Sequence, residues 1–214
     1  MTRCATVRRA FAAGTAACGL LLSGCAALLP PAKPAAPRVQ AVPVYQSSLT
    51  LEGRIAVRYR QEAREESLQG SFRWRQLPER TTVTLLSPLN QTLATLDVTP
   101  DAAQLTEAGK PPRIAADIDT LSRETLGWTL PVAGLRGWLQ GFSLASGRPR
   151  PIAEPGAEDA PPVTTPDGWQ LRYVSWQDED APPLTRPKRI DLQRTTPELG
   201  EMHIRIVIDR WQQP

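Results

Sequence analysis

Residues 49–60 read LTLEGRIAVRYR, and this stretch decides the fold. Apolar or small side chains at the odd positions alternate with mostly polar ones at the even positions. A period of two is typical of a β-strand with one buried face. Residues 68–75, LQGSFRWR, repeat the pattern, with Phe72 and Trp74 on the apolar side. Two such strands in succession predict an antiparallel sheet with one apolar face.

Further short apolar stretches extend this sheet in both halves of the chain. We expect a third strand around 83–86, a fourth near 92–98 and a fifth at 103–107. Strands resume at 168–176, 189–194 and 201–211, after a proline-rich stretch at 147–167 that predicts a long irregular loop. The last strand alternates cleanly, since one side would present Met202, Ile204, Ile206 and Ile208, and the other His203, Arg205, Val207 and Asp209.

Between these two sets of strands the pattern becomes helical. A helix from about 118 could be N-capped by Asp117 or Asp119, and residues 127–131, GWTLP, would end it. A second helix follows with Arg136 as its one charge, and its apolar face would consist of Val132, Leu135, Leu139 and Phe142, with Trp138 beside them. This helix either packs on the sheet as ordinary core or forms a lid over an apolar interior.

The first 25 residues are typical of an export signal. A basic start with three arginines precedes an apolar stretch at 10–22, which is too short to span a bilayer as a helix. Residues 22–25, LSGC, resemble the lipobox of bacterial lipoproteins, in which the cysteine is acylated and becomes the new N-terminus. An ordinary secretory signal that ends near a cysteine is the alternative. We therefore expect residues 1–24 to be a lipoprotein signal peptide and Cys25 to be the lipid anchor.

Removal of this signal changes the charge balance and the cysteine count. Residues 1–24 carry three of the 25 lysines and arginines and no acid, so 22 basic residues face 22 acidic ones in the rest of the chain. Such a balance does not favour nucleic-acid binding, which needs a basic surface. Two of the three cysteines leave with the signal and acylation would consume Cys25, so neither a disulfide nor a thiolate metal site is expected.

Residues 25–48 form the expected tether between the lipid and the folded domain. Five prolines among alanine and valine residues disfavour a helix and favour extended polyproline II backbone. At ~3.1 Å per residue, a fully stretched tether would reach roughly 70 Å from the membrane. One domain, residues 49–214, remains, and it is long enough for a core of its own.

The residues that most enzymes need are missing from the sequence. The chain has one histidine, His203, in the middle of a predicted strand, and no G-x-S-x-G, P-loop or G-x-G-x-x-G motif. No cofactor and no metal is expected, and we interpret the protein as not an enzyme. An acid–base pair formed by folding, acting on envelope lipid, remains the enzymatic alternative.

Several motifs, taken in order, resemble the LolB family over roughly residues 49–212. None is diagnostic alone, but their order and spacing together are specific. Two departures are Asn90, which replaces the family's usual glycine, and the proline content of 147–167. The matching pieces are Gly53-Arg54-Ile55-Ala56-Val57, Phe72-Arg73-Trp74, Ser87-Pro88-Leu89-Asn90, Leu126-Gly127-Trp128 with Leu130-Pro131-Val132, Leu135, Trp138 and Gly141, Gly168-Trp169 with Tyr173, Pro187-Lys188-Arg189-Ile190 with Leu192, and Ile206-Val207-Ile208-Asp209 with Trp211.

This resemblance implies a mainly β fold, an unclosed antiparallel β-barrel with a helical lid over a hydrophobic cavity. It implies that the protein accepts acylated lipoproteins from LolA, a soluble periplasmic carrier, and releases them into outer-membrane phospholipid without nucleotide energy. The tip Pro88-Leu89-Asn90 would be the membrane-insertion loop, with Leu89 exposed. Because Ala26 is not the aspartate that retains lipoproteins at the inner membrane, the resemblance implies the periplasmic face of the outer membrane. A monomer is expected.

Alternation and helical spacing suggest which side chains line the cavity. Each of them could equally fill a solid core, and Leu89 could fold back on the sheet. A structural or envelope-binding lipoprotein without transfer activity is the competing function. A solid core with a polar surface groove would favour it, whereas lipid co-purified in the apolar interior would favour the receptor. The candidate lining residues are Phe72, Trp74, Trp128, Leu135, Trp138 and Leu139.

Overall fold

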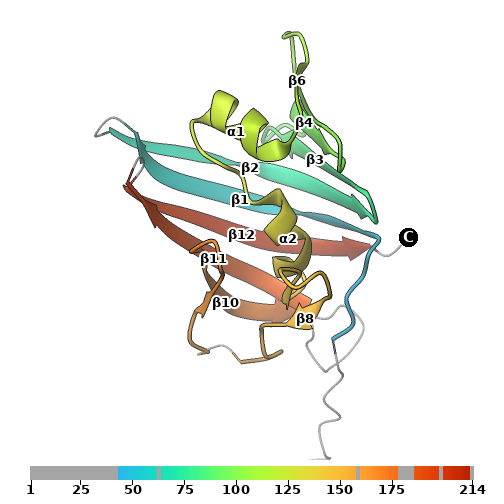
Figure 1. Cartoon of the computed structure of the whole chain (residues 1–214), viewed down its shortest axis with the longest axis vertical. Helices are drawn as coiled ribbons and strands as arrows, with labels where there is room; N and C mark the ends of the chain where they lie inside the picture. The colour runs from blue at the N-terminus through green and yellow to red at the C-terminus, as the bar shows by residue number, and fades with distance from the viewer. Residues whose placement is uncertain (1–42, 62–63, 158–159, 178–185, 198–199, 213–214) are drawn as a thin grey trace, which may run out of the picture. The chain divides into compact units, whose positions relative to one another are not determined.

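The structure is a computed structural model that describes residues 43–61, 64–157, 160–177, 186–197 and 200–212. Ten strands form one sheet, in the order β6-β5-β4-β3-β2-β1-β12-β11-β10-β9 (Figure 1). The strands of this sheet are β1 (Leu49–Gln61), β2 (Arg64–Leu77), β3 (Arg80–Leu86), β4 (Thr92–Val98), β5 (Ala103–Glu107), β6 (Arg113–Ala115), β9 (Val163–Thr164), β10 (Gln170–Gln177), β11 (Arg186–Thr196) and β12 (Gly200–Gln212).

The sheet is antiparallel throughout and open. Its two edge strands, β6 and β9, lie at opposite ends of the strand order and do not pair with each other. The long first and last strands, β1 and β12, pair in the middle and so join the two halves of the chain. The predicted open antiparallel sheet is confirmed. The short edge strands β6 and β9 were not predicted, because three or fewer residues show no measurable alternation.

The predicted alternation has the expected physical consequence in the central strands. In β12, Met202, Ile204 and Ile208 are each at most 4% exposed, whereas His203 and Arg205, which point to the other face, are exposed. The sheet therefore has an apolar inner face and a charged outer face. Burial of the inner face is the main driving force for this fold.

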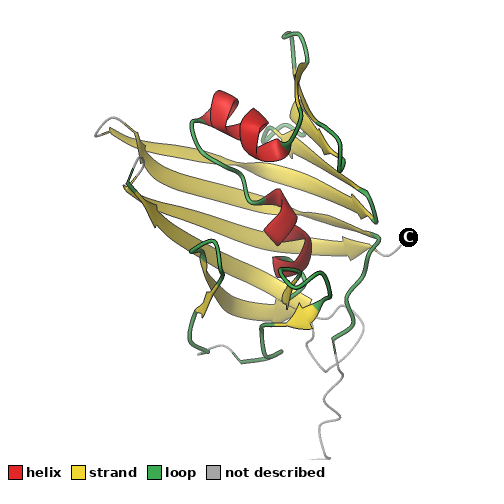
Figure 2. Cartoon of the chain, in the orientation of Figure 1, coloured by secondary structure: helices red, strands yellow, loops and turns green. Residues whose placement is uncertain are grey.

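Two helices lie over the inner face of the sheet (Figure 2). The first, α1 (Ile118–Leu126), begins after Asp117, whose carboxylate accepts a hydrogen bond from the Thr120 N–H at 2.6 Å. It ends at Gly127, which has the left-handed φ of 78°. Both ends therefore follow the sequence signals, an acidic N-cap and a C-terminal glycine.

The second helix, α2 (Val132–Trp138), is shorter than predicted. Phe142, placed by its spacing on the apolar helical face, instead begins the short strand β7 (Phe142–Ser143), which pairs with β8 (Arg150–Pro151). The prediction for Phe142 was therefore wrong. The reason is that Gly141 takes a φ of 83°, which reverses the chain, while Phe142 stays buried by packing from a strand.

Candidate functional site

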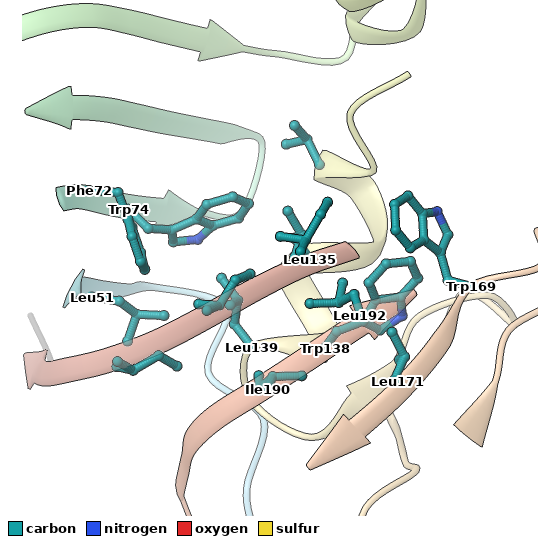
Figure 3. Close-up of a cluster of buried hydrophobic side chains, with 14 of the residues drawn as sticks. Leu51, Phe72, Trp74, Leu135, Trp138, Leu139, Trp169, Leu171, Ile190 and Leu192 are labelled. Carbon is teal, nitrogen blue, oxygen red and sulfur yellow. The ribbon is translucent and has the colours of Figure 1, made fainter. Parts of the chain in front are cut away.

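The inner face of the sheet and the two helices enclose one apolar cluster (Figure 3). All six candidate lining residues belong to it, with exposed fractions between 2% and 8%. They come from three places: β2 supplies two, α2 and the residue after it supply three, and the α1–α2 linker supplies Trp128. The fold thus brings together residues up to 67 positions apart, and in this form their side chains are closed from solvent.

A glycine in helix α2 makes room for a tryptophan of the same helix. A side chain at Gly134 would lie 2.3 Å from the Trp138 ring, so only glycine leaves room for that indole to fold back over the helix. The Trp138 carbonyl accepts a hydrogen bond from the Tyr173 hydroxyl at 2.9 Å. Burial raises the pKa of Tyr173, so this hydroxyl stays protonated and keeps donating to α2.

Buried residues of the C-terminal half also belong to the apolar cluster. Trp169, Leu171, Ile190 and Leu192 are each no more than 1% exposed. The resemblance and the alternation located their strands, but sequence reasoning did not select them as lining residues. Alternation over part of β10 and β11 was a usable signal, since Leu171 and Tyr173 are buried in β10 and Ile190 and Leu192 in β11.

One end of the sheet, where β1 begins, is fastened by polar side chains, and we call it the tether end. Gln76 is 1% exposed; its amide accepts from the Trp74 indole and donates to the Tyr45 hydroxyl and the Gln46 carbonyl. Gln140 binds the same segment twice, because it accepts from the Gln46 N–H at 2.8 Å and donates to its carbonyl at 3.0 Å. The last residues of the expected tether are therefore part of the folded domain.

Arg136 fastens α2 at this same end. Its guanidinium donates to the carbonyls of Leu77 and Pro78 at 2.7 and 2.9 Å and to the Thr81 hydroxyl at 2.6 Å. Hydrogen bonds from a charged donor are stronger than neutral ones. The one charge of α2 thus ties the helix to the β2–β3 turn.

The loop at 87–91 presents an apolar side chain to solvent. The Ser87 hydroxyl accepts hydrogen bonds from the N–H groups of Leu89 and Gln91, each at 3.2 Å, and the Asn90 N–H donates to the Ser87 carbonyl at 2.9 Å. Asn90 takes a left-handed φ of 61°, which asparagine tolerates better than most residues. Leu89 is 81% exposed at the tip of this closed turn, as predicted.

Several ion pairs lie on the outer face of the sheet. Arg54 pairs with Asp209 at 2.8 Å, and Arg189 and Arg205 both pair with Asp191, at 2.6 and 3.2 Å. Burial raises the pKa of Asp191, but the guanidinium groups of Arg189 and Arg205 lower it by more. The pKa of Asp191 therefore lies below the usual 3.8. This face remains charged at neutral pH.

The remaining residues that the sequence singled out are His203 and Cys25. His203 is exposed, with its Nε2 3.3 Å from the Glu201 carboxylate. No three histidine, cysteine or acidic side chains of the described residues gather where they could hold a metal ion. Within that same part of the chain, neither helix has the length and hydropathy to cross a membrane. Cys25 lies outside the described residues.

The fold and the site define a class: a domain in which an open antiparallel sheet and two helices enclose an apolar interior. The family model described as "Outer membrane lipoprotein LolB" matches residues 47–211. The outer-membrane lipoprotein LolB of Cupriavidus pinatubonensis is 41% identical over 168 residues, which cover 76% of this chain and 78% of that protein. The chain therefore belongs to the LolB family.

The chain is also similar to a second relative and to a solved structure. The outer-membrane lipoprotein LolB of Cupriavidus taiwanensis is 38% identical over 193 residues, which cover 89% of this chain and 91% of that protein. A solved structure, the LolA superfamily protein NE2245 from Nitrosomonas europaea, aligns at 9% identity with a TM-score of 0.46, over 80% of this chain and 88% of that chain. The family assignment rests on the sequence matches alone.

Proposed function

We propose that this protein accepts lipoproteins from a LolA-like periplasmic carrier and inserts them into the outer membrane. The observation that carries this proposal is the family match, which spans residues 47–211 and so covers the whole described sheet except its last residue. The buried apolar cluster between the sheet and the helices supports the proposal. Its own side chains fill this interior in the described residues, so the predicted hydrophobic cavity is not confirmed in this form. The protein acts as a receptor and not as an enzyme.

In this proposal the space between the sheet and the helices takes the acyl chains of the cargo. Each buried CH₂ group gains about 0.8 kcal/mol, so an acylated protein cannot cross water without such a shelter. Because Phe72, Trp74, Trp128, Leu135, Trp138 and Leu139 are closed over one another, loading requires α1 and α2 to move away from the sheet. The six residues then contact the acyl chains instead of each other.

Transfer needs no nucleotide, because it follows a gradient of affinity. The receptor must bind acyl chains better than the carrier and less well than the bilayer does, so that cargo moves in one direction. Opening of the interior toward the membrane completes the transfer.

The membrane anchor follows from the N-terminal sequence. We infer that residues 1–24 are a signal peptide, that acylated Cys25 holds the protein on the periplasmic face of the outer membrane, and that residues 25–48 link it to the domain at 49–214. The domain acts as a monomer. A stretched linker of this length lets the domain turn any of its surfaces toward the bilayer.

Leu89 is the residue that contacts the bilayer during release. Three hydrogen bonds to Ser87 hold the turn around Leu89 in one shape. Because this backbone is already ordered, little backbone entropy is lost when Leu89 enters the bilayer. An exposed apolar side chain on a rigid loop gains free energy when it enters the bilayer, because its apolar area leaves water. Pro88 and Asn90 shape the turn, and Leu89 is inserted.

The test is Leu89→Glu, with Ile114→Glu as its matched control. Ile114 is also an exposed apolar residue, 68% exposed, but lies on edge strand β6. Purified domain is mixed with carrier loaded with a lipoprotein, and then with liposomes; cargo is followed on the receptor and in the liposomes. We expect Leu89→Glu to accept cargo normally and to deliver at least roughly tenfold less, since a glutamate costs free energy at the bilayer surface.

Loss of acceptance in Leu89→Glu, or equal loss of delivery in Ile114→Glu, contradicts this role for Leu89. Failure of the unsubstituted protein to take any cargo contradicts the receptor function itself. The alternative, an envelope-binding lipoprotein without transfer activity, is not favoured by the family match.

A further inference from the structure

A pocket of about 290 Å³ lies at the end of the sheet opposite the tether end. Trp128 of the α1–α2 linker, Trp169 before β10 and Met202 of β12 form its apolar wall, and Arg123 and Arg194 complete it. We call it the mouth pocket. Tyr59 of β1 lies beside Trp128 of this pocket. It is eight positions along the strand from Leu51 at the tether end, which is roughly 26 Å at ~3.3 Å per residue.

The apolar wall of this pocket is also the wall of the buried interior. Trp128, Trp169 and Met202 all belong to the central apolar cluster. The Trp169 ring lies 6.4 Å from that of Trp138, and the Trp128 ring lies 6.2 Å from that of Tyr59. Figure 3 places Trp169 at one end of the labelled side chains, beyond Trp138. An acyl chain in the mouth pocket would need to displace one indole to reach the interior.

Both indole rings carry a buried N–H group without an acceptor. Trp128 and Trp169 are 8% and 1% exposed, and neither Nε1 atom has a hydrogen-bond partner among the described residues. The indole N–H groups of Trp176 and Trp211, which lie outside this pocket, also have no partner among the described residues, so unpaired indoles are not particular to it. The two rings therefore serve the pocket as apolar walls.

The two arginines give the pocket a positive charge. Arg194 follows Ile190 and Leu192 on the inner face of β11, so the apolar row ends in a cation, and its guanidinium lies 5.8 Å from the centre of the Trp169 ring. Neither Arg123 nor Arg194 forms an ion pair with a described carboxylate, and none of the described residues that line the pocket is acidic. On the outer face, by contrast, Arg54, Arg189 and Arg205 are paired.

We propose that the mouth pocket binds lipids with a negatively charged head, and that their tails enter the interior there. The proposal rests on the proposed function, since it takes this interior to accept acyl chains, and it adds an entry site and a headgroup chemistry. Arg123 and Arg194 bind the anionic head, and the tail passes between Trp128 and Trp169. A phospholipid phosphate and a fatty-acid carboxylate share this chemistry.

The test compares ligands that have one chain length and different heads. Dodecyl phosphate, laurate and the neutral ester monolauroylglycerol are titrated below their micelle concentrations into the domain, and binding is measured by calorimetry. We expect the anionic ligands to bind roughly tenfold tighter than the neutral one, because hydrogen bonds from a guanidinium to an anion are the stronger kind. Preference for phosphate over laurate would identify a phospholipid head as the source.

Variants assign this preference to the pocket. Arg123→Gln and Arg194→Gln should each remove most of it and leave neutral-ligand binding unchanged, whereas Arg123→Lys and Arg194→Lys should keep part of it. The matched control is Arg75→Gln, at an exposed arginine on the outer face without a described ion pair. Urea unfolding of each variant shows that the fold is retained, and the lysine variants keep the test valid if a glutamine variant unfolds.

The proposal is overturned if neutral and anionic ligands bind equally, or if Arg75→Gln lowers the preference as much as the pocket variants do. The receptor function is tested separately by transfer of lipoprotein from loaded carrier. A protein that takes cargo but shows no headgroup preference keeps its proposed function and loses the mouth pocket. Binding of dodecyl phosphate through the two arginines without cargo transfer supports the pocket and contradicts the receptor function.

Discussion

The two ends of the sheet close the same apolar interior by different means. At the tether end, Gln76 and Gln140 satisfy the backbone of Gln46, and Arg136 ties α2 to the β2–β3 turn. At the mouth end, contact between aromatic rings closes the interior, beside two arginines without an ion pair among the described residues.

This difference indicates which end can open. Separation of α2 from the sheet at the tether end would break several hydrogen bonds at once, including those of a charged donor. Separation at the mouth end would break apolar contacts, which an incoming acyl chain replaces with equivalent ones. We therefore infer that α2 stays fastened at its tether end and that loading begins at the mouth end.

The largest expected effect is the loss of stability when a buried side chain is shortened, and it should differ between the two ends. Leu51→Ala, at a residue that is 0% exposed near the tether end, should lower the free energy of unfolding by ~3–5 kcal/mol. Met202→Ala, at a residue that is 4% exposed in the mouth pocket, should cost only ~2–3 kcal/mol, because a looser site collapses around the missing side chain. Urea unfolding followed by circular dichroism measures both. Equal losses would remove the packing difference.

The next effect concerns polar groups at the two ends. Gln76→Leu should cost ~1–3 kcal/mol, because the Trp74 indole and the Gln46 carbonyl lose a partner inside the protein. Arg194→Met, which replaces a cation without a described ion pair by an apolar side chain of similar length, should change stability by less than ~1 kcal/mol.

The same urea unfolding measures these two variants. A large loss in Arg194→Met, comparable to that in Gln76→Leu, would mean that Arg194 is structural, and this result would weaken the contrast. Arg136→Met serves as the positive control, since it removes a charged donor that does have acceptors.

The smallest expected effect on stability is that of Asp191, which lies on the outer face midway between the ends. The pKa of Asp191 is lowered in the folded protein, so this residue stabilises the fold above its unfolded pKa of about 3.8, and that contribution is lost as the pH falls through the lower folded value. Its side chain is 30% exposed, so we expect less than ~1 kcal/mol. Unfolding of Asp191→Asn and the unsubstituted protein should differ at pH 7 and converge toward pH 3. A difference that persists at pH 3 would contradict an electrostatic cause.

The sequence predicted the central strands well because long strands with one buried face must alternate. It predicted the ends of α1 for the same kind of local reason, since Asp117 and Gly127 act on backbone groups within four residues of themselves. It failed for Phe142 and for the edge strands β6 and β9. There the choice between helix, strand and loop depends on a partner strand that no local pattern reveals.

The candidate site divides in the same way. Exposure of Leu89 was predictable, because a Pro-Leu-Asn tip between two strands holds its own turn. The six candidate lining residues were predictable as buried, since alternation and helical spacing mark them. The sequence did not indicate that Arg194 continues an apolar row, or that Gln76 and Gln140 meet Gln46.

By itself the sequence determined an antiparallel sheet with one apolar face and membership of a family by motif order, and it predicts an export signal with a lipidation motif. These follow from patterns within short stretches, where each residue acts on its near neighbours. Only the tertiary structure decided which end of the interior is fastened by polar side chains and which places two arginines beside a wall of indole rings. The physical reason is that the hydrogen bonds between Gln46 and Gln140, and the pocket that Arg123 and Arg194 line together, exist only after folding has brought these distant residues together.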